Sequence, residues 1–123
     1  MNQIEITIGA VVLVIDCLDT PTSNAILSAL PIQSSAKVWG KEVYFPVPVN
    51  VKKESDAKDI VDCGEIAFWV EGSCIAIGFG PTPISCGDEI RLAAKTNIWG
   101  HTSDDLDLLS AVHEGDPISM KRR

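Results

Sequence analysis

The sequence predicts a mainly β domain that folds as a closed or nearly closed barrel with two short helices. Short runs of β-branched and aromatic residues recur along the 123 residues and are separated by turns that contain Gly or Pro. Apolar residues at helical spacing are confined to two brief stretches, so the strands do not alternate with long helices as in an α/β sheet. A closed barrel is the β architecture that leaves the fewest unpaired strand edges.

Length and composition fit one domain over residues 1–123. Hydrophobic residues make up 46% and charged residues 22%, as in ordinary globular proteins. Seventeen acidic against ten basic residues give a net charge of −7, which repels nucleic acids and anionic membrane surfaces. The apolar run of residues 8–15 is too short to cross a bilayer, and the N-terminus lacks the basic region of a signal peptide. We therefore expect a cytoplasmic protein that binds neither nucleic acid nor membrane.

The first half of the chain contains signals for strands and one helix. Residues 4–15 read as one strand that is half buried at first and wholly buried later. A helix is expected after Thr20, which caps it, with Pro21 in the first turn and Pro31 ending it. Residues 36–49 predict a strand pair or a kinked strand, and the charged residues 52–59 that follow predict a solvated loop.

A β-hairpin is expected where residues 65–70 and 74–80 form two apolar runs joined by a Gly-containing link. Alternation along the first run places Ile66 and Phe68 on one face and Trp69 on the other. If the first face fills the barrel, Trp69 lies on the outer surface. There it is either covered by a loop or offered to a ligand.

The pattern is weaker in the last third of the chain. It indicates one short helical turn after Pro83 and a strand near residues 97–99. Residues 103–112 have leucines at helical spacing and predict a second short helix, capped by Ser103. Residues 116–122 predict a closing strand at the sheet edge.

No metal or cofactor site is expected. None of the four cysteines has the C-x-x-C spacing of a zinc or redox site. We expect them to be buried and reduced, and the alternative is a disulfide in a thermophilic cytosol. His101 lies near the carboxylates of residues 104–107, which allows a metal site or, as is more common, a set of helix caps. The glycines of residues 78–87 lack the Lys and the following helix of a phosphate-binding loop.

Residues 77–85, "IGFGPTPIS", interrupt the second hairpin run and form either a corner or a site. Gly80 permits a close backbone approach or a positive φ, and Pro81 and Pro83 each fix their own φ. The segment is therefore expected to be a stiff corner at the rim of the barrel.

Three segments, "VWGKEVYFPVP", "GEIAFWVEG" and "IGFGPTPIS", occur in the order found in the small prokaryotic cyclophilin-like family, which the chain resembles over most of its length. The resemblance implies a closed, eight-stranded cyclophilin-type barrel. It carries no established biochemical role.

True cyclophilins are peptidyl-prolyl isomerases whose site lies on the outer face of the barrel and depends on an Arg. Here no Arg precedes Arg91, and the strand that resembles the arginine-bearing one reads "EVYF". The resemblance therefore favours a non-catalytic module that binds a small ligand or an extended peptide. The alternatives are a weak prolyl isomerase and a subunit of a larger amide-processing or lactam-processing enzyme.

The binding groove implied by this resemblance lies beside Trp69 and the loop that follows residue 79. Arg91 is its expected polar anchor, although an ion pair of Arg91 with Asp88 or Glu89 is the more ordinary arrangement. The predicted ligand-binding residues are Tyr44, Trp69, Phe79, Gly80, Pro81, Thr82 and Arg91.

Overall fold

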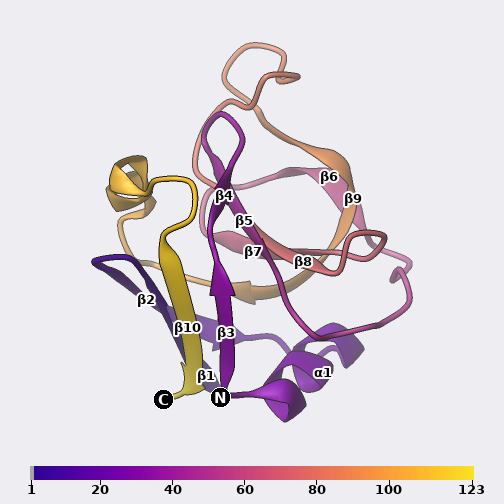
Figure 1. The fold of residues 1–123 in the computed structure, drawn as a ribbon. Helices are drawn as coiled ribbons and strands as arrows, with labels where there is room; N and C mark the ends of the chain where they lie inside the picture. The colour runs from indigo at the N-terminus through magenta and orange to yellow at the C-terminus, as the bar shows by residue number, and fades with distance from the viewer. Residues whose placement is uncertain (1) are drawn as a thin grey trace.

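A computed structural model of the chain describes residues 2–123 (Figure 1). Within these residues it has ten strands, one α-helix, α1 (Pro21–Ala29), and one 3-10 helix, η1 (Leu106–Ala111). The strands are β1 (Gln3–Ile8), β2 (Val11–Cys17), β3 (Ile32–Ser35), β4 (Lys37–Val38), β5 (Glu42–Pro46), β6 (Lys58–Val61), β7 (Glu65–Trp69), β8 (Cys74–Gly78), β9 (Ile90–His101) and β10 (Pro117–Arg122). The predicted mainly β class with two helices is confirmed.

The strands form a nearly closed barrel. Antiparallel neighbours follow the order β3-β10-β1-β2-β9-β7-β8-β5-β4, and β6 pairs with β9 outside this path. The two ends of the path, β3 and β4, are consecutive in the chain and are separated only by Ala36, whose N–H donates to the carbonyl of Asp116 (2.9 Å). The Ser34 hydroxyl donates to the Pro46 carbonyl (2.7 Å) and ties β3 to β5.

The strand count differs from the expected eight for two physical reasons. At Ala36 the chain changes partner from β10 to β5, which divides one extended run into β3 and β4. The charged segment that was expected to be a loop also ends in a strand, β6, beginning at Lys58. The path therefore has nine strands, and β6 is the tenth.

The prediction of one long strand at the N-terminus is wrong, because the chain turns back at Gly9. The φ of Gly9 is +57°, a left-handed conformation that favours glycine. The two resulting strands, β1 and β2, pair along their whole length, and buried positions alternate in both. An uninterrupted apolar run therefore conceals a tight hairpin.

Helix α1 begins and ends as the sequence predicts. The Thr20 hydroxyl accepts a hydrogen bond from the Ser23 N–H (3.1 Å), and Pro21 occupies the first turn. Ile26 and Leu27 are buried against the barrel core, and the helix ends at Ala29, two residues before Pro31.

The C-terminal third is more regular than predicted. Strand β9 runs for 12 residues rather than the three expected, and β10 lies between β1 and β3 instead of at an edge. Helix η1 is capped by Asp105, not Ser103: the Asp105 carboxylate accepts from the Asp107 N–H (3.0 Å). Among residues 2–123, no helix is long and apolar enough to span a bilayer.

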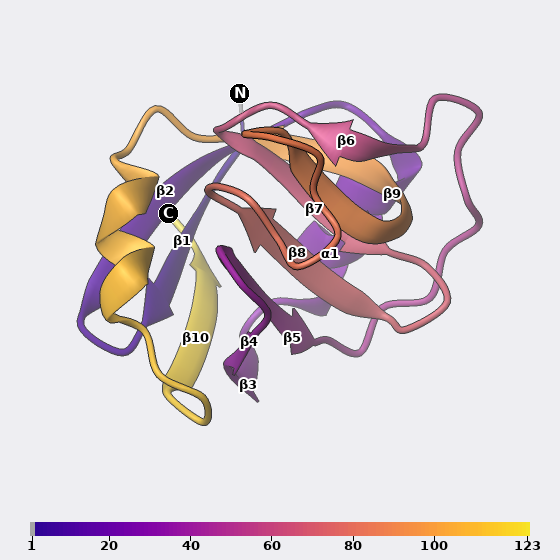
Figure 2. The ribbon, with the colours of Figure 1, turned by 90° about the horizontal axis from the view of Figure 1, so that it is seen from above.

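Strand β9 bends so that its two halves belong to different layers. Its last residues pair with β7 and β2 in the barrel wall, whereas its first residues pair with β6. In Figure 2, β6 lies against β9 on the far side of the molecule from β10. The β6–β9 pair thus covers part of the outer surface of the barrel.

Two apolar clusters result from this arrangement. The larger fills the barrel and includes Ile66, Phe68, Ile75 and Ile77, which confirms the predicted inward face of the β7–β8 hairpin. Each such fully buried side chain contributes roughly 1.5–3 kcal/mol to folding. The smaller cluster lies outside the barrel, between the hairpin and the β6–β9 pair, and consists of Val61, Ala67, Ala76, Ile90 and Leu92.

Candidate ligand-binding site

The outer face of strands β5, β7 and β8 is hollow because its central side chains are small. Ala76 of β8 is paired with Ala67 of β7 on one side and with Tyr44 of β5 on the other. Residues paired directly across antiparallel strands point to the same face. Two methyl groups therefore lie in the middle of this face, with larger side chains around them.

A cavity of about 160 Å³ occupies this hollow. It resembles in size the engineered cavity of 150 Å³ in another protein that holds one benzene molecule. The cavity thus has room for a ligand group of roughly benzene size. It is lined by Trp39, Glu42, Tyr44, Trp69, Cys74, Ala76, Leu92, Ala93, Ala94 and Thr96.

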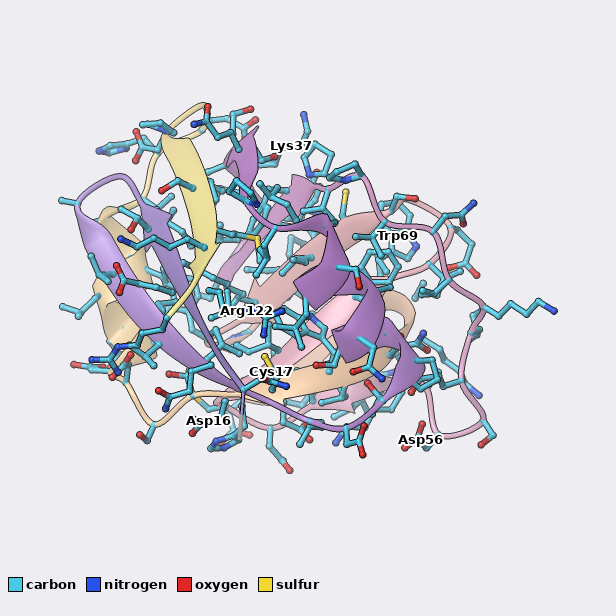
Figure 3. The ribbon with its side chains drawn as sticks, turned by 90° about the horizontal axis from the view of Figure 1, so that it is seen from below. Asp16, Cys17, Lys37, Asp56, Trp69 and Arg122 are labelled. Carbon is cyan, nitrogen blue, oxygen red and sulfur yellow. The ribbon has the colours of Figure 1, made fainter. Side chains whose placement is uncertain are left out.

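Two tight turns position the tryptophans of the cavity. Trp39 precedes the β4–β5 turn, where its N–H donates to the Glu42 carbonyl (3.0 Å). Trp69 ends β7, and the following turn packs on its ring so closely that a Cβ on Gly72 would lie 2.2 Å from the ring atoms Cε3 and Cζ3. The turn therefore covers one part of Trp69, while another part lines the cavity. Figure 3 shows Trp69 well apart from Asp16, on another side of the barrel.

Glu42 is the charged residue among those that line the cavity, and its side chain is unusually isolated. It is only 6% exposed, and its Oε1 atom is buried without a hydrogen-bond partner among residues 2–123. Because burial disfavours the carboxylate, the pKa of Glu42 rises from its ordinary value of 4.5 to about 7. Near neutral pH this carboxyl group can both lose and gain a proton.

Sequence reasoning noted Glu42 only as part of the "WGKEVYF" motif and missed it as a site residue. A signal was present, because Glu42 and Tyr44 lie on the face opposite Val43 and Phe45, which are fully buried in the core. An acidic residue next to an aromatic residue on the outer face of a strand indicates a carboxyl group in partly apolar surroundings, which is a candidate site residue. The sequence did not reveal that β9 covers this position.

The seven predicted site residues do not converge on one place. Tyr44 and Trp69 line the cavity, whereas Phe79 packs against the main core. Gly80 lies against the side chain of Lys41. Pro81 and Thr82 also lie outside the cavity lining. The ligand-binding roles assigned to these residues stay predictions.

The segment from Gly80 to Pro83 forms a corner that packs on the β4–β5 turn. The Lys41 N–H donates to the Pro81 carbonyl (3.1 Å), and the Thr82 hydroxyl donates to the carbonyl of Arg91. The positive φ falls at Gly40 (+59°) rather than at Gly80, and a Cβ on Gly40 would lie 2.8 Å from Cδ of Pro83. The glycine that this close packing requires is therefore on the facing turn.

Arg91 is held by carboxylates away from the cavity. Its Nε donates to Oε1 of Glu89 (3.1 Å), and its NH1 lies 3.5 Å from Oδ2 of Asp59. The expected alternative, an ion pair with Glu89, is confirmed. The described residues that line the cavity include no Arg or Lys, so the charged group there is Glu42 rather than Arg91.

The cysteines are free, but only two of them are buried as predicted. Cys17 and Cys74 are buried, and burial raises the pKa of both thiols. Cys63 and Cys86 are exposed because they lie in turns rather than in strands. Within residues 2–123, no group of three or more His, Cys, Asp or Glu side chains is arranged to hold a metal ion.

Two of the carboxylates near His101 accept hydrogen bonds from backbone N–H groups. Asp104 accepts a hydrogen bond from the Val14 N–H (2.8 Å), and Asp105 caps η1. The capping interpretation therefore holds for Asp105, whereas Asp104 ties the segment before η1 to β2.

Comparisons with known proteins agree on the family and the fold. A family model described as Cyclophilin-like matches residues 2–121. A hypothetical protein of Archaeoglobus fulgidus, known from a solution structure, is 34% identical to the chain and superimposes with a TM-score of 0.84. The match covers 99% of this chain and 95% of that protein. No curated protein matches the chain.

Proposed function

The chain belongs to the cyclophilin-like family, and from this premise we propose that it is a non-catalytic binding module that holds a small ligand, or one side chain of an extended peptide, beside Glu42. The observation that carries the proposal is a cavity lined by three aromatic side chains and by a buried carboxyl group with an unpaired oxygen. Apolar cavities with a few convergent polar groups are the usual form of small-molecule sites. A cytoplasmic location is part of the same proposal.

The unpaired oxygen supports a binding role because burying it without a hydrogen-bond partner costs folding free energy. A buried polar atom without a partner destabilises a fold by roughly 1–3 kcal/mol, and a charged atom by more. Glu42 lines the cavity together with small residues such as Ala76 and Ala94, which leave room there. A ligand that places a donor or a positive charge next to the Glu42 carboxyl group would offset the cost of burying it.

Binding is favoured over prolyl isomerisation because the described cavity lining has no arginine. Rotation about a peptide bond has a barrier of about 18–20 kcal/mol, and a catalyst must stabilise the twisted state more than the ground state. Arg91, the donor that the sequence suggested, is engaged by Glu89 and Asp59. No contact among residues 2–123 favours a subunit of a larger enzyme over these two functions.

An NMR titration with a library of small fragments tests the proposal. We expect ligand-induced shifts at the indole N–H signals of Trp39 and Trp69 and at Tyr44. Ala76→Val places two methyl groups in the hollow and should weaken binding about tenfold or more. Ala111→Val, at an exposed position of η1, is the matched control and should bind like the wild type. Shifts that cluster elsewhere, or equal binding by the two variants, would refute the proposed site.

A further inference from the structure

We propose that the cavity recognises an alkylated organic ammonium group, with Glu42 as its counter-ion and Trp39, Tyr44 and Trp69 as its aromatic wall. This inference rests on the proposed binding function and names the chemical class of the ligand. We infer a cationic ligand because the charged side chain among the described lining residues is that of an acid.

The lining combines aromatic side chains with one carboxyl group, which favours a cation. The faces of Trp and Tyr attract cations, and the attraction is stronger where water is excluded. Three such side chains and one carboxyl group line the same small space. The Thr96 hydroxyl, another polar group of the lining, already donates to the Lys58 carbonyl (2.9 Å). Among the described lining residues, Oε1 of Glu42 is the buried polar atom that still lacks a partner.

The size and polarity of the cavity fit an ammonium group that carries methyl groups. A volume of about 160 Å³ holds a group as large as benzene, so a nitrogen bearing three or four methyl groups fits. Its methyl groups would contact Leu92, Ala93 and Ala94, and its charge would face Glu42. A metal ion would need further ligands that the described residues do not gather, and an anion would be repelled.

Other ligand classes leave the unpaired carboxyl group without compensation. A neutral apolar group would fill the space but would supply no partner to Glu42. A primary ammonium group carries strongly held water, which this largely apolar lining cannot replace with enough acceptors. An alkylated ammonium group brings charge with weaker hydration, and it gains from aromatic contact.

The proposal also predicts how binding depends on pH. A cation favours the ionised form of Glu42, so binding should strengthen as pH rises through neutrality and should release a proton. Lys37 is exposed and is paired across the ladder with Tyr44. The other titratable groups that line the cavity or lie beside it are Tyr44, Cys74 and the Lys58–Glu65 ion pair (2.7 Å).

The test compares choline with its neutral isostere, 3,3-dimethyl-1-butanol, in which carbon replaces the charged nitrogen. NMR titrations at pH 8 should give shifts at Trp39, Tyr44 and Trp69, and choline should bind about tenfold more tightly than the alcohol. Glu42→Gln keeps the shape of the side chain and should bring the two affinities within about twofold. The comparison within the wild-type protein stands even if that variant folds poorly.

The possible results separate this inference from the proposed function. Binding of the alcohol at least as tightly as choline, at the cavity residues, overturns the cation assignment and leaves the binding module intact. If fragments bind in the cavity and neither probe does, the cation assignment is again wrong; if nothing binds there, the proposed function fails too. A third probe, acetylated trimethyllysine amide, identifies the source: tighter binding than choline assigns the ammonium group to a peptide side chain, and weaker binding assigns it to a free small molecule.

Discussion

Glu42 on β5 lies directly opposite Gly78 on β8, and the missing side chain of Gly78 is what allows Glu42 to be covered. A Cβ on Gly78 would lie 2.4 Å from Cγ2 of Ile90, the first residue of β9. Because Gly78 has no Cβ, Ile90 and Leu92 pack down on the outer face of the barrel. The strand that closes the cavity therefore also removes the carboxyl group from water.

Ionised Glu42 should destabilise the fold, so Glu42→Gln should stabilise the protein at high pH. The pKa of about 7 in the folded protein lies above the ordinary value of 4.5 expected in the unfolded chain. The folded state thus binds more protons between these values, and stability is full below pH 4.5 and is lost as pH rises through 7. The loss amounts to about 3 kcal/mol, which the variant should regain at pH 8 but not at pH 4. Urea unfolding at both pH values measures it.

Glu71→Gln is the control for this prediction, because its environment is opposite. Lys53 lies 2.8 Å from the Glu71 carboxylate at the surface and lowers its pKa by a hydrogen bond. The Glu71 carboxylate stabilises the fold above its ordinary pKa, and this stabilisation is lost as pH falls. The Glu71→Gln variant should therefore gain no stability at pH 8. Equal stability of Glu42→Gln and wild type across pH 4–8 would show that Glu42 is solvated.

Gly72→Ala should disturb the cavity, whereas Gly80→Ala should not. The new methyl group at position 72 would overlap the Trp69 ring, which must move or lose its contact with the turn. We expect a destabilisation of roughly 1–3 kcal/mol and weaker ligand binding. At position 80 the neighbouring group is the flexible side chain of Lys41, which can turn aside. Chemical unfolding and Trp fluorescence of both variants measure the difference; similar behaviour of the two would show that the contact between Gly72 and Trp69 is unimportant.

Prolyl isomerase activity should be absent or far below that of true cyclophilins. The reason is that Arg91 is paired with Glu89 and Asp59, and the described cavity lining has no Arg. A coupled assay with a prolyl peptide measures the rate, and Arg91→Ala should leave ligand binding in the cavity unchanged. Activity near that of a true cyclophilin, lost in Arg91→Ala, would overturn the non-catalytic proposal.

The four thiols should react in two classes. Cys63 and Cys86 are exposed and should be modified quickly in the native protein. Cys17 and Cys74 are buried, and burial raises the pKa of their thiols, so they should react only slowly until the protein unfolds. A thiol reagent that counts two fast groups in buffer and four in denaturant would agree, and rapid reaction of all four would not.

Local signals in the sequence predicted the elements that depend on local chemistry. The cap of α1 at Thr20 and the β7–β8 hairpin each follow from a few neighbouring residues. The turn at Gly9 was missed because Gly and Ala continue an apolar run without a polar break. Strand β9 was underestimated because its polar residues are stabilised from afar: the Asn97 amide donates to the Thr22 hydroxyl and to the Lys52 carbonyl (3.0 Å each).

The cavity was predicted only in part, because some of its features depend on contacts between distant segments. Alternation placed Trp69 on the outer face, and the family resemblance added Tyr44, both of which line the cavity. Glu42 was missed because its burial depends on β9, which begins 48 residues later in the chain. The prolines and the arginine of residues 80–91 led to a predicted binding role for this segment, but its contacts are those of a structural corner.

The proposed site depends on the buried carboxyl group of Glu42, whose pKa can be measured in solution. NMR observation of the side-chain carboxyl carbon over pH 3–9 reports the ionisation of this one group. We expect a pKa of about 7 in the free protein and a lower pKa when choline is bound. A midpoint at the ordinary value of 4.5, unchanged by choline, would contradict both the buried carboxyl group and the ligand site built around it.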